Sequence, residues 1–471
     1  MAGASWIKIR INLRLSTMRT KIALLISVCL ALNLSAAEET NSPSGALSGY
    51  SFVARPRPSH LILRRGDRLA ICGDSITEQK MYSRIMEDYL TMCVSELHIT
   101  VRQYGWSGEK APGFLSRMTN DCLRFKPSVA TTCYGMNDHQ YRPYTDEIGE
   151  TYRTNSDAII RAFKARHVRV VLGSAGCVGK VPHWQSNAYT VDDLNLNLSK
   201  LWNIDVVLAK SERVSFADVF WPMFNGQKLA TEKYDNDYHV SGADGVHPGW
   251  AGHTIMAYAF LRAMGLDGDI GTFTLDLKKN RMKASKGHAV LSSKDGEFEI
   301  RSSRYPFCPC EPEGTAVKSY PACDKDDISK DNSIRSGMTL VPFNQDLNRV
   351  TLIIKNPKAA QYRVTWGTET KTFPSEQLVR GINLAAEFSA NPFTEAFARV
   401  DAAVAAKQAF ETKEIKQDFR PHGVKNPTPE EIAAQTDKVV ADDEKTHAEL
   451  AEAIQQAFAP VTYVIKISPQ D

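Results

Sequence analysis

The spacing of hydrophobic residues changes once along the chain, near residue 270. Between about residues 60 and 265, short apolar runs rich in β-branched residues alternate with longer segments of helical character. The strand-like runs are RLAIC, HITVRQY, SVATTCY, VRVVLGSA and VSFADVF. This alternation predicts an α/β fold, with a parallel sheet between helices and a site formed by the loops after the strands.

Beyond that point the pattern favours paired strands and then helices. The runs KDGEFEIRSS, NRVTLIIKN and YRVTWGTETKTF are strand-like, with hairpin-type turns such as Asp295-Gly296. They predict a small antiparallel β-rich accessory domain over 270–390. The remainder, 391–471, predicts helices near 392–418 and 429–458 and a closing strand, VTYVIKI. The second helix opens on a capping box, in which Thr428 is followed by Glu431.

The amino-terminal segment has the features of an export signal. A short basic head, 18–21, precedes an apolar run, 22–34, and the small residues Ser35, Ala36 and Ala37. We therefore expect residues 1–37 to be a signal peptide cleaved near Ala37, with Met18 as a candidate start and a periplasmic or secreted product. A buried helix or a membrane anchor is the alternative, although the apolar run is short for a bilayer span.

Charge limits the possible partners. The net charge is +3, but the first 37 residues contain five basic residues and no acidic one, so the remainder carries −2. A body so close to neutral has no electrostatic footprint for nucleic acid or an anionic membrane. We expect no nucleic-acid partner and no stable membrane span.

Three cysteines lie close together in the stretch FCPCEPEGTAVKSYPACDKDD: Cys308, Cys310 and Cys323. In an oxidising compartment a structural disulfide is the favoured interpretation. Metal binding is the alternative, but the spacing fits no standard zinc pattern.

Ser75 lies in LAICGDSITE, where a predicted strand meets a predicted helix. A serine at that position is either a helix cap or a nucleophile. The motif is not the nucleophile elbow of the α/β-hydrolases, because Thr77 stands where that motif has glycine.

The loop GADGVHPGWAGH places Asp244 and His247 three residues apart. A nucleophilic serine needs an imidazole to accept its proton and a carboxylate to orient that imidazole, and this loop offers both. A capping aspartate and an exposed loop histidine form the alternative. His253 is a second candidate base, but it has no acidic partner nearby in the sequence.

Two further loops offer donors for an oxyanion. QYGWSGEKAPG contributes the backbone N–H groups of Gly105 and Gly108, and CYGMNDH contributes the side-chain amide of Asn137. A turn glycine and a turn-forming asparagine are the structural alternatives.

Together these segments resemble one known family. GDSIT at 73–77, GWSGEK at 105–110, GMND at 135–138 and DGVH at 244–247 follow the order of the four blocks of the SGNH hydrolases, also called GDSL-type esterases. The resemblance covers residues 60–265. It implies a three-layer α/β/α sandwich, hydrolysis of carboxylic esters, and no metal or organic cofactor.

The resemblance also implies a role for each motif residue. Ser75 would be the nucleophile, His247 the general base and Asp244 the residue that orients the imidazole. The oxyanion hole would consist of the backbone N–H groups of Ser75 and Gly108 and the side-chain amide of Asn137.

The expected substrate is a small-molecule or polysaccharide ester. Export, a slightly acidic body and the accessory β domain favour O-acetyl groups on a carbohydrate or glycan. Trp106 and Trp250 adjoin the motifs and are candidates to stack on a sugar, with ordinary packing as the alternative. Two other functions stay open: a lysophospholipase or thioesterase, and a glycan-binding envelope protein with little catalysis.

Overall fold

The predicted parallel sheet is present in the first part of the chain. The computed structural model describes residues 53–56, 60–185, 188–309 and 329–470. Five strands lie in the order β2-β1-β3-β4-β5, and every neighbouring pair is parallel. Their bounds are β1 (Arg68–Gly73), β2 (Thr100–Gln103), β3 (Val129–Cys133), β4 (Arg169–Gly173) and β5 (Ser215–Ala217). All five residues of β3 are buried, as expected for a central strand covered on both faces.

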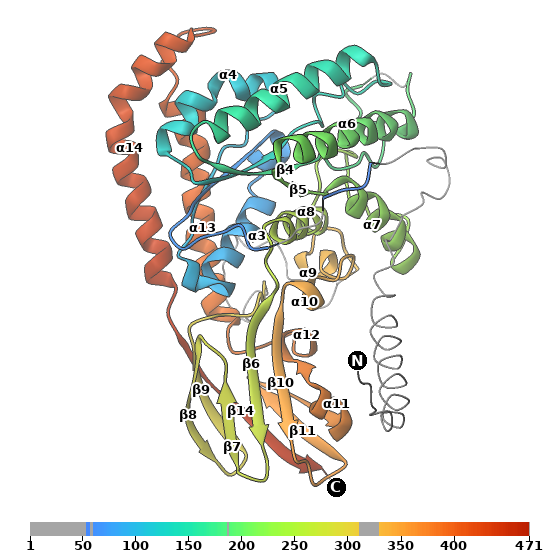
Figure 1. Ribbon diagram of the computed structural model, residues 1–471, viewed down its shortest axis with the longest axis vertical. Coiled ribbons are helices and arrows are strands. Elements are labelled where there is room, and N and C mark those ends of the chain that lie inside the picture. Colours follow the sequence, from blue (N-terminus) through green and yellow to red (C-terminus); the bar gives the residue numbers. More distant parts are fainter. Residues whose placement is uncertain (1–52, 57–59, 186–187, 310–328, 471) are drawn as a thin grey trace, which may run out of the picture. The chain divides into compact units, whose positions relative to one another are not determined.

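Helices cover both faces of this sheet (Figure 1). On one face lie α4 (Ala111–Asp121), α5 (Asp146–Lys164) and α6 (Val191–Glu212). On the other lie α3 (Tyr82–Asp88) and α8 (Trp250–Ala263). This is the three-layer sandwich that the alternating pattern predicts.

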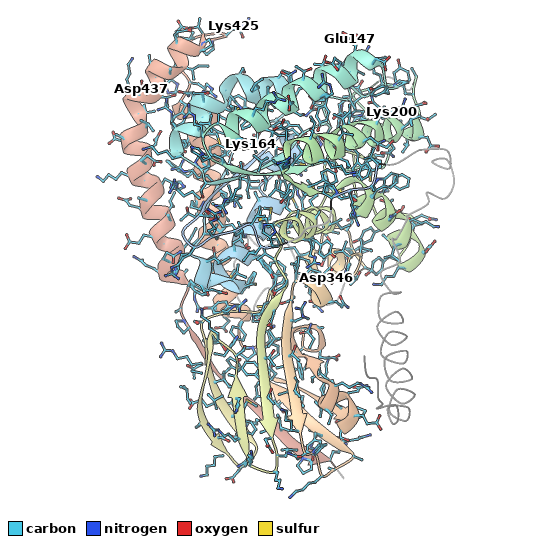
Figure 2. The ribbon with its side chains drawn as sticks, viewed as in Figure 1. Glu147, Lys164, Lys200, Asp346, Lys425 and Asp437 are labelled. Atoms are coloured by element: carbon cyan, nitrogen blue, oxygen red, sulfur yellow. The ribbon has the colours of Figure 1, made fainter. Side chains whose placement is uncertain are left out.

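The sequence at the ends of α5 shows why a helix forms there. The Thr145 hydroxyl accepts a hydrogen bond from the backbone N–H of Ile148 and so caps the first turn. Glu147 lies in the first turn and Lys164 in the last, at opposite ends of the helix (Figure 2). An acid at the amino end and a base at the carboxyl end both stabilise the helix dipole.

Two further sheets follow. The second sheet has the order β13-β10-β6-β7 and the third the order β12-β11-β14-β9-β8. Their strands are β6 (Asp269–Asp276), β7 (Arg281–Ala284), β8 (His288–Lys294), β9 (Glu297–Ser302), β10 (Arg349–Lys355), β11 (Gln361–Trp366), β12 (Glu369–Pro374), β13 (Ile382–Asn383) and β14 (Val461–Gln470). The turn between β8 and β9 contains Asp295 and Gly296, both with positive φ, as the hairpin signal predicts.

One strand pair corrects the expectation of a purely antiparallel region. β6 and β10 pair in parallel. More than seventy residues separate them, which is long enough for the chain to return and run in the same direction again. The closing strand, β14, lies in the middle of the third sheet, between β11 and β9.

The predicted carboxy-terminal helices are also present. α13 (Thr394–Lys413) continues into a π-helical turn, η4 (Glu414–Asp418), and α14 (Pro429–Ala457) begins on the predicted capping box of Thr428 and Glu431. The remaining elements are α2 (Ser75–Glu78), η1 (Tyr89–Cys93), η2 (Ser95–Leu97), η3 (Leu123–Phe125), α7 (Phe220–Lys233), α9 (Ile334–Gly337), α10 (Phe343–Asp346), α11 (Ser375–Arg380) and α12 (Leu384–Glu387).

Some sequence predictions fall outside the described residues. The signal peptide, 1–37, is one of them. Cys308 is buried, but Cys310 and Cys323 lie outside the described part, so the disulfide stays a prediction.

Side chains of α13 cover the open edge of the first sheet. β2 is an edge strand, so its outward backbone groups have no neighbouring strand. The Lys407 ammonium donates to the Val101 carbonyl over 2.7 Å, and the Glu411 carboxylate accepts from the Gln103 N–H over 3.0 Å. Lys407 also pairs with Glu411 and with Glu87 at 3.1 Å. Burial lowers the pKa of Lys407, but the two carboxylates outweigh this effect and raise it, so the ammonium stays charged.

We predict that Lys407→Met lowers the free energy of unfolding by about 3–5 kcal/mol, because it removes the ammonium that pairs with two buried carboxylates. Urea denaturation measures the change. Lys466→Met is the control: Lys466 and Glu297 form an exposed pair, 2.8 Å apart, so the expected loss is about 1 kcal/mol or less. Equal losses in the two variants would contradict a stabilising role for the buried cluster.

Candidate active site

The four sequence motifs meet at the carboxyl end of the first sheet. Ser75 is the first residue of α2, directly after β1 and the N-cap residue Asp74. Gly73 is the last residue of β1, and no side chain fits there, because a Cβ would lie 2.0 Å from the Thr77 hydroxyl oxygen and 2.9 Å from the Cys133 carbonyl oxygen. The Asp74 carboxylate accepts the Ile76 N–H over 3.0 Å, and burial raises its pKa to about 7. Asp74, rather than Ser75, therefore caps the helix.

Ser75, His247 and Asp244 form one hydrogen-bonded series. The Ser75 Oγ lies 2.8 Å from the His247 Nε2, and the His247 Nδ1 lies 2.7 Å from the Asp244 Oδ2. The carboxylate can only accept in this contact, so Nδ1 carries the proton and Nε2 is left as an acceptor for the serine hydroxyl. The side chains of His247 and Asp244 are 31% and 28% exposed, so a ligand can reach the imidazole from solvent.

Asp244 is held by the loop that it belongs to. Its Oδ1 accepts the backbone N–H groups of Val246, over 2.9 Å, and His247, over 2.8 Å. Burial raises the pKa of Asp244, but these hydrogen bonds and the contact with His247 outweigh it and lower the pKa below its ordinary value. The carboxylate is therefore ionised at neutral pH and can accept the Nδ1–H of His247.

A glycine makes this loop possible. Gly242 has φ of +79°, and a Cβ on it would lie 1.7 Å from the His247 carbonyl oxygen. No side chain fits there without moving the backbone of the histidine. The Gly-rich composition of the motif thus has a steric cause.

The two oxyanion candidates lie in loops that are hydrogen-bonded together. We call residues 104–110 the oxyanion loop. Gly108 is exposed within it, at φ of +73°, and the side-chain amide of Asn137 donates to the Glu109 carbonyl over 3.1 Å. The amide keeps a second N–H for a ligand. The Tyr141 hydroxyl approaches the Asn137 Oδ1 at 3.4 Å, which fixes which end of the amide faces the loop.

Asp138 joins the same loops from behind. Its Oδ1 accepts the Ala111 N–H over 2.9 Å and its Oδ2 accepts the Gly135 N–H over 3.0 Å. Burial raises its pKa to about 6, although both hydrogen bonds act in the opposite direction. One buried carboxyl group therefore connects the loop after β2 with the loop after β3.

His253, the second candidate base, has a different environment. Its Nδ1 accepts the Tyr82 N–H over 3.2 Å, and its Nε2 donates to the Gln79 side chain over 3.2 Å. The ring is fully buried, and burial lowers its pKa to about 3. A neutral imidazole with both nitrogens engaged is a structural residue of α8, not a base for an incoming ligand.

The two tryptophans proposed for sugar stacking are already in contact with protein groups. Trp250 is only 7% exposed, and Arg84 lies over its ring at 5.9 Å. Trp106 is half-buried, and three cations surround its ring. The structure does not support the expectation for Trp250, because a sugar needs an open ring face.

A different aromatic side chain lies beside the imidazole. Trp184 is 43% exposed, and its ring centroid is 5.9 Å from that of His247 and 6.2 Å from that of Tyr141. In the sequence, His183 and Trp184 lie in the segment that follows β4. Segments after the strands of a parallel sheet form its binding site, so this position indicates that the two residues lie near the site.

Comparison with protein families identifies this region. Residues 71–255 match the model of the GDSL-like lipase/acylhydrolase family. This segment belongs to that family. The resemblance seen in the four sequence blocks is confirmed over these residues, which form a carboxylic ester hydrolase segment of the GDSL type.

Solved structures share the fold. A gut microbial diltiazem-metabolizing enzyme is 21% identical, with a TM-score of 0.67, over 88% of this chain and 100% of its own. That coverage extends well beyond the GDSL segment, so the fold of the two later sheets is shared as well. No curated protein sequence matches the chain at a significant level.

Shorter proteins align with part of the chain. An acetylxylan esterase from Geobacillus stearothermophilus is 22% identical over 43% of this chain and 96% of its own, with a TM-score of 0.36. LAE5, an alpha/beta hydrolase enzyme from the metagenome of Lake Arreo, is 21% identical over 43% and 97%, with a TM-score of 0.34.

The described residues contain neither a candidate membrane span nor a candidate metal cluster. In the part of the chain that the structure describes, no helix is both long and apolar enough to cross a membrane. The same residues contain no group of three or more His, Cys, Asp or Glu side chains arranged to hold a metal ion.

We predict that Gly242→Ala abolishes most of the ester turnover, because the new Cβ displaces the His247 backbone. Steady-state kinetics on a small ester measures the loss. Gly66→Ala is the matched control, since Gly66 has φ of +80° but no atom within 4 Å of a new Cβ. It should lower stability by about 1–2 kcal/mol through backbone strain alone and leave turnover unchanged. Similar turnover in the two variants would show that the loop tolerates the clash.

Proposed function

We propose that the chain hydrolyses esters through an acyl-enzyme on Ser75. The supporting observation is the pair of hydrogen bonds, 2.8 and 2.7 Å long, that run from Ser75 through His247 to Asp244. This is the arrangement that a serine hydrolase needs, with a nucleophile, a base and a carboxylate in sequence.

In the first half of the reaction the Ser75 Oγ attacks the ester carbonyl carbon while the His247 Nε2 takes the serine proton. The negative charge on the carbonyl oxygen is stabilised by the N–H groups of Ser75, Gly108 and Asn137. The tetrahedral intermediate then collapses, the bond to the leaving alcohol breaks, and the imidazolium returns the proton to that alcohol. Asp244 stabilises the imidazolium while it exists.

In the second half, water takes the place of the alcohol. His247 removes a proton from the water, whose oxygen attacks the acyl carbon. Collapse of the second intermediate breaks the bond to Ser75, and the imidazolium protonates the Ser75 Oγ. The products are one carboxylic acid and one alcohol, and the enzyme is regenerated.

For the substrate we propose O-acetyl groups on a carbohydrate or glycan. Trp184 supports this choice, because an exposed indole beside His247 offers a flat apolar face to a sugar ring that carries the ester. The signal-like segment that ends near Ala37 supports action outside the cytoplasm, where such polymers occur.

We predict that Ser75→Ala abolishes acetate release while the protein stays folded. The panel consists of acetylated xylan, other acetylated glycans, diltiazem, p-nitrophenyl acetate and a long-chain acyl ester. Release from acetylated glycans that disappears in the variant supports the proposal. Turnover of the long-chain ester alone would favour a lysophospholipase or thioesterase, and turnover that survives in Ser75→Ala would overturn the assignment of the nucleophile.

We also predict that Trp184→Ala raises KM for an acetylated glycan about tenfold, which corresponds to the loss of one aromatic contact. Turnover of p-nitrophenyl acetate should stay within about twofold, because the small ester does not need the platform. Leu291→Ala, which truncates a 52% exposed side chain in the third sheet, is the control for lost apolar surface. An equal effect of Trp184→Ala on both substrates would show that the ring positions His247 and does not bind sugar.

A further inference from the structure

A single carboxylate fixes the residue before Gly108. Glu78 lies at the end of α2, three residues after Ser75. Its Oε2 accepts both the backbone N–H of Ser107, over 2.5 Å, and the Ser107 hydroxyl, over 2.7 Å. Both donors of Ser107 are therefore engaged by Glu78, one residue before the Gly108 N–H.

The second oxygen of this carboxylate is held by a residue from the far end of the sequence. Lys416, in the π-helical turn η4, donates from its Nζ to the Glu78 Oε1 over 2.6 Å. Burial raises the pKa of Glu78, but the hydrogen bonds from Lys416 and Ser107 outweigh it and lower the pKa. Glu78 is therefore ionised at neutral pH, and Lys416 supplies the cation that this half-buried charge needs.

Lys416 also contacts the oxyanion loop directly. Its Nζ lies 5.3 Å from the centroid of the Trp106 ring, and the guanidinium groups of Arg420 and Arg117 lie 4.9 and 5.1 Å from the same ring. Cations at these distances are attracted to an indole. Arg420 is in turn anchored by Asp121, over 2.6 Å.

The loop is packed closely against β1 and α2. A Cβ on Gly105 would lie 2.2 Å from the Glu78 backbone nitrogen, and the Trp106 N–H donates to the Gly73 carbonyl over 3.1 Å. The loop therefore lies against the end of β1 and the helix that carries Ser75. Lys416 contacts both Glu78 of this helix and Trp106 of the loop.

We propose that Lys416 is a positioning residue for ester hydrolysis. Its ammonium connects Glu78 with Trp106, and through them it holds the oxyanion loop so that the Gly108 N–H is aimed at the reacting carbonyl oxygen. This inference rests on the proposed role of Gly108. Lys416 lies outside the GDSL segment, 71–255. The inference therefore gives the carboxy-terminal helical segment a part in the active site at the edge of the first sheet.

The test compares Lys416→Met with Lys416→Arg on p-nitrophenyl acetate. A displaced oxyanion donor acts on the transition state, so Lys416→Met should lower kcat and kcat/KM together, by about tenfold or more, with KM within about twofold. Lys416→Arg should recover most of the loss, because a guanidinium can pair with Glu78 and face Trp106. The double variant Glu78→Gln/Lys416→Met should lose little more kcat than either single variant, because both substitutions break the same ion pair between Lys416 and Glu78.

A second readout does not depend on turnover. Amide hydrogen exchange at residues 104–110 should be faster in Lys416→Met than in the wild type and unchanged in Lys466→Met, the matched loss of a remote surface ion pair. The inference is overturned if kcat of Lys416→Met equals that of Lys466→Met, or if exchange in the loop does not change.

Ser75→Ala separates this inference from the proposed function. If Ser75→Ala is inactive while Lys416→Met keeps full kcat, the positioning role fails and the nucleophile stands. If Ser75→Ala keeps its turnover, the proposed function fails, and loop exchange alone decides whether Lys416 holds the loop.

Discussion

The parallel pairing of β1 with β2 and β3 is the constraint on which the site depends. The register sets Gly73 opposite Cys133, and Ile71 opposite both Gln103 and Thr131, so the three strands end at nearly the same level. The residues that follow them must therefore share one edge of the sheet. Ser75, the oxyanion loop and Asn137 therefore meet there, where hydrogen bonds between the loops hold them together. The loop of Asp244 and His247 needs only to approach that edge from the start of α8.

The residues predicted from sequence are those whose partners are close in the chain or follow a strand. Asp244 and His247 are three residues apart, and the hydrogen bonds between them form within one turn of the backbone. Ser75 and Asn137 come directly after strands, so the fold class alone predicts that they lie near each other. The alternation of apolar and polar segments was sufficient for the five parallel strands and for α13 and α14.

The remainder could not be predicted because it depends on packing between distant segments. Trp250 is adjacent to the His247 motif in sequence, but it begins α8, whose first turn directs the ring under Arg84. Lys416 is separated from Glu78 by 338 residues, and nothing in a lysine's local sequence indicates which carboxylate it will meet. The parallel pairing of β6 with β10 was missed for a similar reason, since strand periodicity does not specify strand direction.

The cover over β2 has a consequence for how the enzyme can be divided. Lys407 and Glu411 occupy the places that the backbone of a sixth strand would otherwise take. An ester hydrolase cut out at the end of its GDSL segment would present the bare Val101 carbonyl and Gln103 N–H to any other chain with a free strand. Self-association through that edge would then compete with folding. By occupying this edge, α13 prevents β2 from pairing with a strand of another chain. A shortened form of the enzyme should therefore keep α13 together with the first sheet.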